Sequence, residues 1–176
     1  IAARRWVGRW QAGAGATWSM DSLDYPKGST IAAGLPLLPG TITYDEVRGG
    51  AIEHLILASS PITARGEWVW PARSGDGQSD DPDSPPMGTW LRLREDVDLS
   101  GLGPQARVIA AAAQRYGVLL SDTGPGLRLR GTPDARWDNE DLDTLRQLSS
   151  DDFEVVDPRD VVVSEGSFYV RAERER

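Results

Sequence analysis

The chain has 176 residues, a formal net charge of −8 at pH 7 and no cysteine. This length suits one ordinary domain with its own core, and seven tryptophans within 39% hydrophobic residues favour a folded globule. The acidic balance argues against a nucleic-acid partner, no apolar run approaches the ~20 residues of a membrane-spanning helix, and the lack of cysteine excludes disulfides and thiolate chemistry.

The first third of the chain is predicted to contain strands joined by irregular segments. Residues 4–20 are typical of two strands that meet at a turn. Residues 34–47 hold Pro36 and Pro39 and then a short β-branched run, which indicates an irregular lead into a strand or turn. The strongest strand pattern of the chain follows at residues 51–60, AIEHLILASS.

The next predicted strand covers residues 66–72 and contains two tryptophans. Trp68 and Trp70 fall on one face because side chains alternate along a strand. Pro71 lacks a backbone N–H and therefore marks the end of the strand or an edge position. Residues 74–87, which are rich in Gly, Asp, Ser and Pro, are predicted to be a surface loop.

The second half of the chain contains two predicted helices. The first covers about residues 104–116, because Pro104 suits the first helical position and Gly117 suits the C-terminal stop. A second, shorter helix is expected at about residues 139–148, where leucines recur at helical spacing. Further strands and a final hairpin are expected at residues 90–96, 118–121, 127–131 and 161–170.

These elements predict a mainly β fold. Strands outnumber helices and turns recur every 8 to 12 residues, which favours an antiparallel β-sandwich-like body with one packed α-helix and a second short helix. We expect a single β-rich domain over residues 1–176, with a frayed, solvated tail at residues 172–176.

Two side chains are candidates for proton transfer. His54 is the only histidine, and imidazole titrates nearer to neutral pH than other side chains. It shares a strand face with Ile52 and Ile56, so a structural role on an apolar face is the alternative. Asp45 is the carboxylate candidate, since paired carboxylates carry glycoside hydrolysis. The catalytic candidates are therefore His54 and Asp45.

Three side chains after the second strand are candidates for ligand binding. Trp68 and Trp70 could form a stacking platform for a sugar or another flat apolar ligand, while burial in the core is the alternative. Arg73 could bind a carboxylate or phosphate in a bidentate manner, or it could pair with the acidic loop.

Two other motifs have low specificity. Asp-Thr-Gly at residues 122–124 follows an apolar strand, as in aspartic proteases, but that chemistry needs two such carboxylates and hence a homodimer here. No cofactor is expected. Calcium is the alternative, because four loop carboxylates could gather a hard cation, although their spacing does not match an EF-hand: Asp76, Asp80, Asp81 and Asp83.

Six stretches carry a family resemblance: AAGLPLLPGTITYDEV, AIEH, WVWPAR, PPMGTWLRL, QARVIAAAAQRYGVLLSDTG and GTPDARWDNEDLDTL…DFEVVD. In content and order they resemble a family of uncharacterised, secreted bacterial and fungal proteins, over roughly residues 10–157. The family shows a histidine after WPAR where this chain has Ser74, and ADNGS where it has SDTGP. If that histidine carries function, the function is lost or altered here.

The resemblance also implies location and context. Family members are exported, so we expect a secreted, extracellular protein. They are longer at the N-terminus, so we expect this chain to be the C-terminal part of a longer precursor, with an upstream segment or a partner chain.

The sequence thus predicts a secreted carbohydrate-active or carbohydrate-binding protein whose site lies between the AIEH and WVWPAR strands. In an enzyme, which would act by acid/base hydrolysis or elimination on a glycan, His54 or Asp45 would move the proton. Arg73 would orient the substrate, and Trp68 or Trp70 would stack on it. Whether the protein is an enzyme stays open. The alternatives are a non-catalytic structural or binding module without a small-molecule site, and a homodimeric protease.

Overall fold

A computed structural model describes residues 3–6, 9–13, 15–19, 21–25, 28–164 and 166–171. In these ranges the helices are α1 (Tyr44–Gly49), α2 (Pro104–Arg115) and α3 (Asn139–Asp143). The strands are β1 (Ala3–Trp6), β2 (Arg9–Ala12), β3 (Ile56–Ser60), β4 (Trp90–Leu93), β5 (Val118–Thr123), β6 (Arg128–Leu129) and β7 (Phe153–Val155). Short 3-10 turns are η1 (Leu38–Gly40), η2 (Thr144–Gln147), η3 (Ser150–Asp152) and η4 (Pro158–Asp160).

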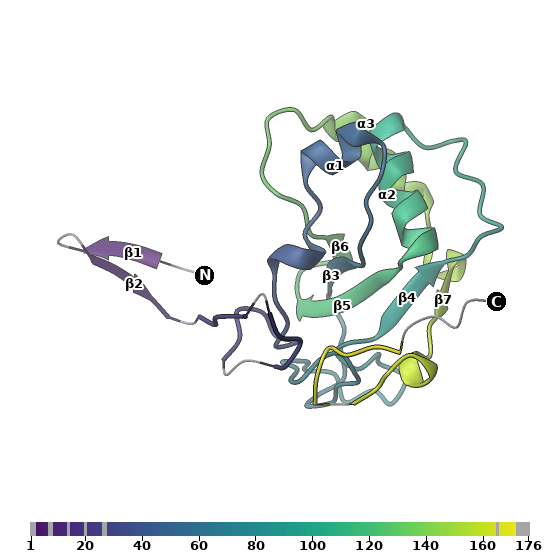
Figure 1. Ribbon diagram of the computed structural model, residues 1–176. Coiled ribbons are helices and arrows are strands. Elements are labelled where there is room, and N and C mark those ends of the chain that lie inside the picture. The colour runs from purple at the N-terminus through teal and green to yellow at the C-terminus, as the bar shows by residue number, and fades with distance from the viewer. Residues whose placement is uncertain are drawn as a thin grey trace.

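The described part of the chain contains one five-stranded sheet with the strand order β6-β3-β5-β4-β7. Strands β3 and β5 run parallel, whereas the other neighbouring pairs run antiparallel. The sheet is therefore mixed, and the predicted antiparallel arrangement is wrong for the β3–β5 pair. The parallel pair arises because β4 and α2 lie in the crossover between β3 and β5. A separate antiparallel ribbon, β1–β2, stands apart from this sheet (Figure 1).

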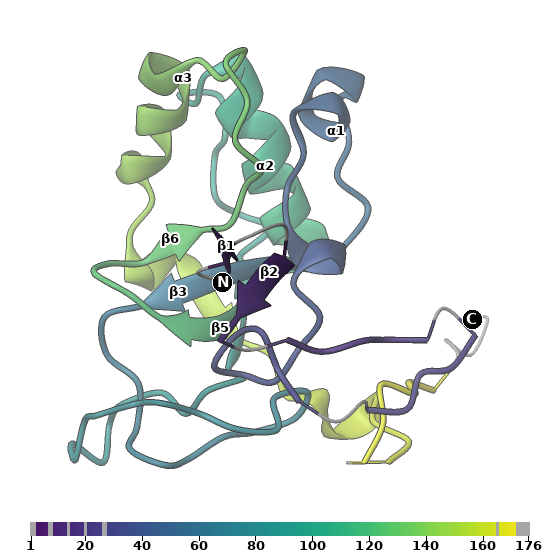
Figure 2. The ribbon, with the colours of Figure 1, turned by 90° about the vertical axis from the view of Figure 1, so that its left-hand side faces the viewer.

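The two faces of the sheet have different coverings. Helices lie against one face, and long irregular segments lie against the other (Figures 1 and 2). The helical face is packed by Ile56, Ala58, Val118 and Leu120 of the sheet with Ala106, Ile109, Ala110 and Ala113 of α2. The opposite face is packed by Leu57 and Leu119 with Ile31, Ala33, Leu35, Ala72 and Met87. In the described residues this second layer consists of loops, so the second sheet of a sandwich stays a prediction.

Helix α2 confirms the first predicted helix. Gly103 is its N-cap, Pro104 is its first residue, and the chain leaves it through Gly117 at φ +86°. The helix is followed at once by β5, so its end fixes where the central strand begins. The second predicted helix is confirmed as α3 and the 3-10 turn η2, which continues it to Gln147.

Helix α1 lies in a region that was predicted to be irregular. Its signal is a capping box: the Thr43 hydroxyl accepts from the Glu46 N–H, and the Glu46 carboxylate accepts from the Thr43 N–H. Gly50, at φ +87°, ends the helix. Pro36 belongs to the segment before it, so the prolines do not interrupt it.

The predicted strand at residues 66–72 is wrong. Only an isolated bridge between Trp68 and Met87 forms there, and the Trp70–Pro71 peptide is cis. Residues 74–87 contain no helix or strand, as predicted for the loop. The predicted tail, residues 172–176, lies outside the described residues. Within the described ranges, no helix combines the length and the apolar character that crossing a bilayer requires.

Candidate functional site

A cleft of about 1310 Å³ opens on the loop-covered side of the molecule. We call it the aromatic cleft. Its aromatic lining residues are Tyr25, Trp68, Trp70 and Trp90. Its charged lining residues are Arg73, Asp83, Asp157 and Arg159, and the remainder are Val69, Ala72, Ser84, Pro85, Pro86, Gly88, Thr89, Val155, Val156, Pro158, Val162 and Gly166.

The two tryptophans of the WVWPAR segment form a wall of this cleft. Trp68 is 51% exposed, and Trp70 is half-buried. The Trp70 indole N–H donates to the Ser167 carbonyl at 3.0 Å, which holds the segment against the C-terminal residues. The sequence left two alternatives for these tryptophans, a binding platform and burial in the core. Neither tryptophan belongs to the buried core, and both line the cleft.

Arg73 lies at the same wall, in contact with Tyr25. Its guanidinium carbon stands 4.4 Å from the Tyr25 ring centroid, which is a cation–π geometry. The Tyr25 hydroxyl donates to the Pro71 carbonyl at 2.9 Å, and its ring meets Phe168 edge-on. Burial raises the pKa of Tyr25 to about 12, against the opposing effect of the Arg73 charge. This corner of the cleft is therefore held by contacts between three distant parts of the chain.

The end of β7 and the turn η4 also line the cleft. Asp157 caps η4 by accepting from the Arg159 N–H at 3.0 Å. The guanidinium of Arg159 also bonds both Asp157 carboxylate oxygens, with its Nε at 2.9 and 2.8 Å. These hydrogen bonds hold the pKa of Asp157 at about 2, so the side chain is a carboxylate at neutral pH.

His54 contacts helix α1 and is not part of the cleft lining. One ring nitrogen is 3.0 Å from the Glu46 carboxylate of α1, and the other is 2.9 Å from the Leu55 carbonyl. Both ring nitrogens are therefore engaged within the protein. Partial burial raises the pKa of Glu46, but hydrogen bonds from Thr43 and the His54 contact outweigh it and lower the pKa below its usual value.

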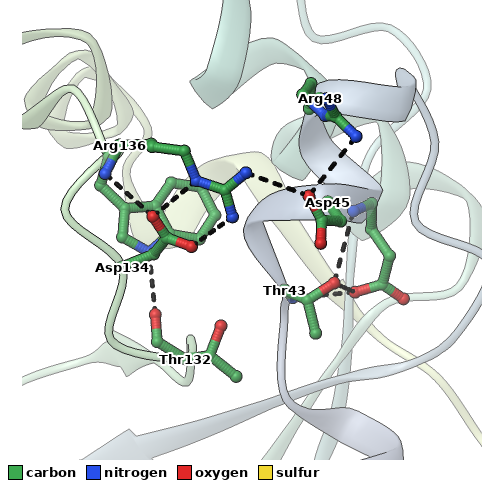
Figure 3. Close-up of polar contacts among 8 residues, drawn as sticks. Thr43, Asp45, Arg48, Thr132, Asp134 and Arg136 are labelled. Carbon is green, nitrogen blue, oxygen red and sulfur yellow. Dashed lines mark hydrogen bonds and ion pairs between the residues drawn. The ribbon is translucent and has the colours of Figure 1, made fainter.

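Asp45 lies in a network of ion pairs at the tip of α1 (Figure 3). Its carboxylate is 3.7 Å from the Arg48 guanidinium and 3.3 Å from that of Arg136, and its side chain is 67% exposed. Arg136 bonds both oxygens of Asp134, and these hydrogen bonds lower the pKa of Asp134 to about 2. Arg136 also covers the Tyr44 ring at 4.1 Å. The network joins α1 to the loop before α3.

The structure thus separates the predicted site residues into two groups. Trp68, Trp70 and Arg73 meet at one cleft, whereas Asp45 belongs to α1, His54 contacts α1, and neither lines the cleft. A catalytic role for these two stays a prediction.

Sequence patterns did not single out the other cleft residues. Tyr25, Trp90 and Asp157 reach the cleft from segments far apart in the chain. Trp90 was recognisable only as part of a strand, and its indole N–H donates to the Tyr116 carbonyl at 2.9 Å. Aromatic residues make up 7% of the chain, and four of them line this cleft. Their residue type was the one feature of the sequence that could have drawn attention to them.

Two aspartates of the loop at residues 74–87 bind other parts of the protein. Asp80 pairs with Arg65 at 2.6 Å, and the Thr123 hydroxyl donates to Asp76 at 2.6 Å. No group of three or more His, Cys, Asp or Glu side chains suited to a metal ion occurs in the part of the chain that the structure describes. The Ser74 hydroxyl donates to the Ala32 carbonyl at 2.7 Å.

Comparison with known proteins found no match: no family model fits the chain, and neither a curated protein nor a solved structure is similar to it.

Proposed function

We propose that this chain binds carbohydrate through the aromatic cleft. The observation that carries the proposal is the half-exposed indole of Trp68 on the wall of an open cleft that Trp70 and Tyr25 also line. A sugar ring presents a patch of C–H groups on its face and hydroxyls at its edge. Such a ring can cover an indole with its C–H face while its hydroxyls stay in water or bond to polar groups.

The remaining lining of the cleft is compatible with sugar hydroxyls. Besides Tyr25, the hydroxyl side chains of the lining are Ser84 and Thr89. Each donates its own proton within the protein, to the Ser79 hydroxyl and the Pro86 carbonyl respectively, at 2.7 Å in both cases. Their oxygens keep acceptor capacity, but both side chains are buried, at 9% and 7% exposure, so the proposal does not rest on them. A mainly apolar pocket with a few polar groups is typical of small-molecule sites.

The proposal is for binding and not for hydrolysis or elimination. The two candidate proton carriers, His54 and Asp45, are engaged by Glu46 and Arg136 and do not line the cleft. The cleft does contain the carboxylates Asp83 and Asp157, but Asp157 is held by Arg159. Export from the cell, which the family resemblance implies, belongs to the same proposal.

Affinity electrophoresis through gels that contain soluble polysaccharides tests this proposal. We expect retention of the wild-type chain by at least one polysaccharide, and Trp68→Ala should weaken it about tenfold, a loss of about 1.4 kcal/mol. The matched control is Tyr169→Ala, because Tyr169 is also an exposed aromatic (45%) but does not line the cleft. If Trp68→Ala were retained as strongly as the wild type, the cleft would not be the binding site.

A further inference from the structure

We infer that the ligand of the aromatic cleft is an uncharged oligosaccharide segment and not an anionic glycan. This inference rests on the proposed function and adds to it the chemical class of the sugar. Three observations carry it: the charges in the cleft cancel, both cations in the cleft already have partners, and the cleft is larger than a single small ligand needs.

The four charged side chains of the lining are two arginines and two aspartates, Arg73, Arg159, Asp83 and Asp157. Their formal charges sum to zero, so the cleft offers no net attraction to a carboxylate or sulfate group. Beyond the cleft, the whole chain has a net charge of −8, which repels a polyanion at long range. Sites that select anionic polymers instead show an excess of clustered cations.

Arg159 is occupied by a carboxylate of the protein itself. Its Nε bonds both oxygens of Asp157, and Asp157 is held in place by the Arg159 N–H. A sugar carboxylate that approached the guanidinium would meet the Asp157 charge at the same position. The protein thus fills the forked donor geometry that normally recognises such a group.

Arg73 has a partner of a different kind. Its guanidinium lies over the ring face of Tyr25, the electron-rich part of the aromatic ring. This contact fixes the plane of the guanidinium against the wall of the cleft. Arg73 is therefore already engaged by the protein, as Arg159 is.

The size of the cleft indicates more than one sugar ring. Its volume of about 1310 Å³ exceeds the ~300–1,000 Å³ of pockets that enclose a drug-sized molecule. Its aromatic rings come from three separate segments, at Tyr25, at Trp68 with Trp70, and at Trp90. Apolar surface spread in this way can contact successive rings of a chain.

The test compares polymers that share a backbone and differ in charge. The purified chain is run through gels that contain hydroxyethylcellulose or carboxymethylcellulose, and a wider panel adds neutral galactomannan, arabinoxylan and glycol chitin together with polygalacturonate, alginate and hyaluronan. Each gel is run at about 20 mM and about 500 mM NaCl, because only ionic contacts weaken strongly over this range.

We expect at least one neutral polymer to retain the chain more strongly than every anionic polymer, with less than about a twofold change between the two salt concentrations. Stronger or equal retention by an anionic polymer would overturn the inference and leave carbohydrate binding intact. If no polymer of either class retained the chain, the proposed function itself would fail.

A charge variant tests the reason for this preference. Asp157→Asn keeps an oxygen that can accept from the Arg159 N–H, but it leaves the guanidinium without its carboxylate. We expect a gain of about threefold or more in retention by carboxymethylcellulose, and this gain should disappear at high salt. Unchanged retention by the anionic polymer would show that charge cancellation is not what excludes anions.

Discussion

The Asp141 carboxylate of α3 accepts a hydrogen bond from the backbone N–H of Gln105 at 2.8 Å, and so caps a helix to which it does not belong. Its second oxygen accepts from the Ala106 N–H at 2.9 Å. Helix α2 needs this cap because its own N-cap, Gly103, has no side chain. The negative charge also lies at the favourable end of the helix dipole. The stability of α2, which packs on the sheet, therefore depends on the position of α3.

Replacing Asp141 by alanine should lower the free energy of unfolding by about 1–2 kcal/mol, because two N–H groups of α2 lose their acceptor. Urea unfolding followed by circular dichroism measures the change. The matched control is Asp143→Ala, since Asp143 lies in the same helix but forms an exposed ion pair with Arg146, and its effect should stay below about 0.5 kcal/mol. Equal losses in the two variants would mean that the cap contributes nothing.

A comparison of alanine substitutions at Gly117 and Gly50 distinguishes the cost of backbone strain from the cost of a steric clash. Both have φ values in the left-handed region, +86° and +87°. A Cβ on Gly117 would lie 2.3 Å from the Trp90 indole nitrogen and 2.5 Å from the Leu91 carbonyl oxygen, whereas a Cβ on Gly50 would meet nothing within 4 Å.

We therefore expect Gly50→Ala to cost about 1 kcal/mol, the strain of a left-handed alanine, and Gly117→Ala to cost about 3 kcal/mol or more. Thermal unfolding measures both. Tryptophan fluorescence should change only in Gly117→Ala, because Trp90 must move. Similar losses in the two variants would show that the region around Trp90 adapts without cost.

The contact of Glu46 with Thr43 and His54 should make stability depend on pH in the acidic range. The pKa of Glu46 is lower in the folded chain than its usual value of 4.5, so its ionisation stabilises the fold above that value. This contribution should be lost as pH falls below 4.5 through the lower, folded pKa. Glu46→Gln lacks the titration, and the difference in free energy of unfolding between it and the wild type should shrink between about pH 6 and pH 3. A difference that does not vary with pH would contradict the prediction.

Tyr25 should titrate at unusually high pH. Its pKa is raised to about 12 because burial disfavours the phenolate. A raised pKa means that the neutral form stabilises the fold below pH 10, and that this contribution is lost as pH rises through 12. Absorbance of the phenolate, recorded against pH for the wild type and Tyr25→Phe, should differ by one step near 12. If the step that Tyr25→Phe removes from the wild-type titration curve lay at or below pH 10, the raised pKa of Tyr25 would be contradicted.

Local sequence signals were sufficient to predict an element when residues typical of its first and last positions are present. Helix α2 was predictable because Pro104 and Gly117 delimit an apolar stripe within about three turns. The capping box of Thr43 and Glu46 is an equally local signal for α1, but the prediction for this region used only the prolines and the β-branched run. The alternation of Trp68 and Trp70 could not distinguish a strand from an extended loop. That distinction depends on whether Met87 and its neighbours offer a full ladder or a single bridge.

The sequence by itself determined the elements whose signals are local: α2, the central strands and the turn-rich acidic loop. It also determined that Trp68, Trp70 and Arg73 are close to one another, because six residues of chain cannot separate them far. Only the tertiary structure decided that β3 and β5 pair in parallel, that Tyr25 and Asp157 join the same cleft, and that His54 and Asp45 do not. The physical reason is that pairings between distant segments depend on the packing of both sheet faces, which no short stretch of the chain encodes.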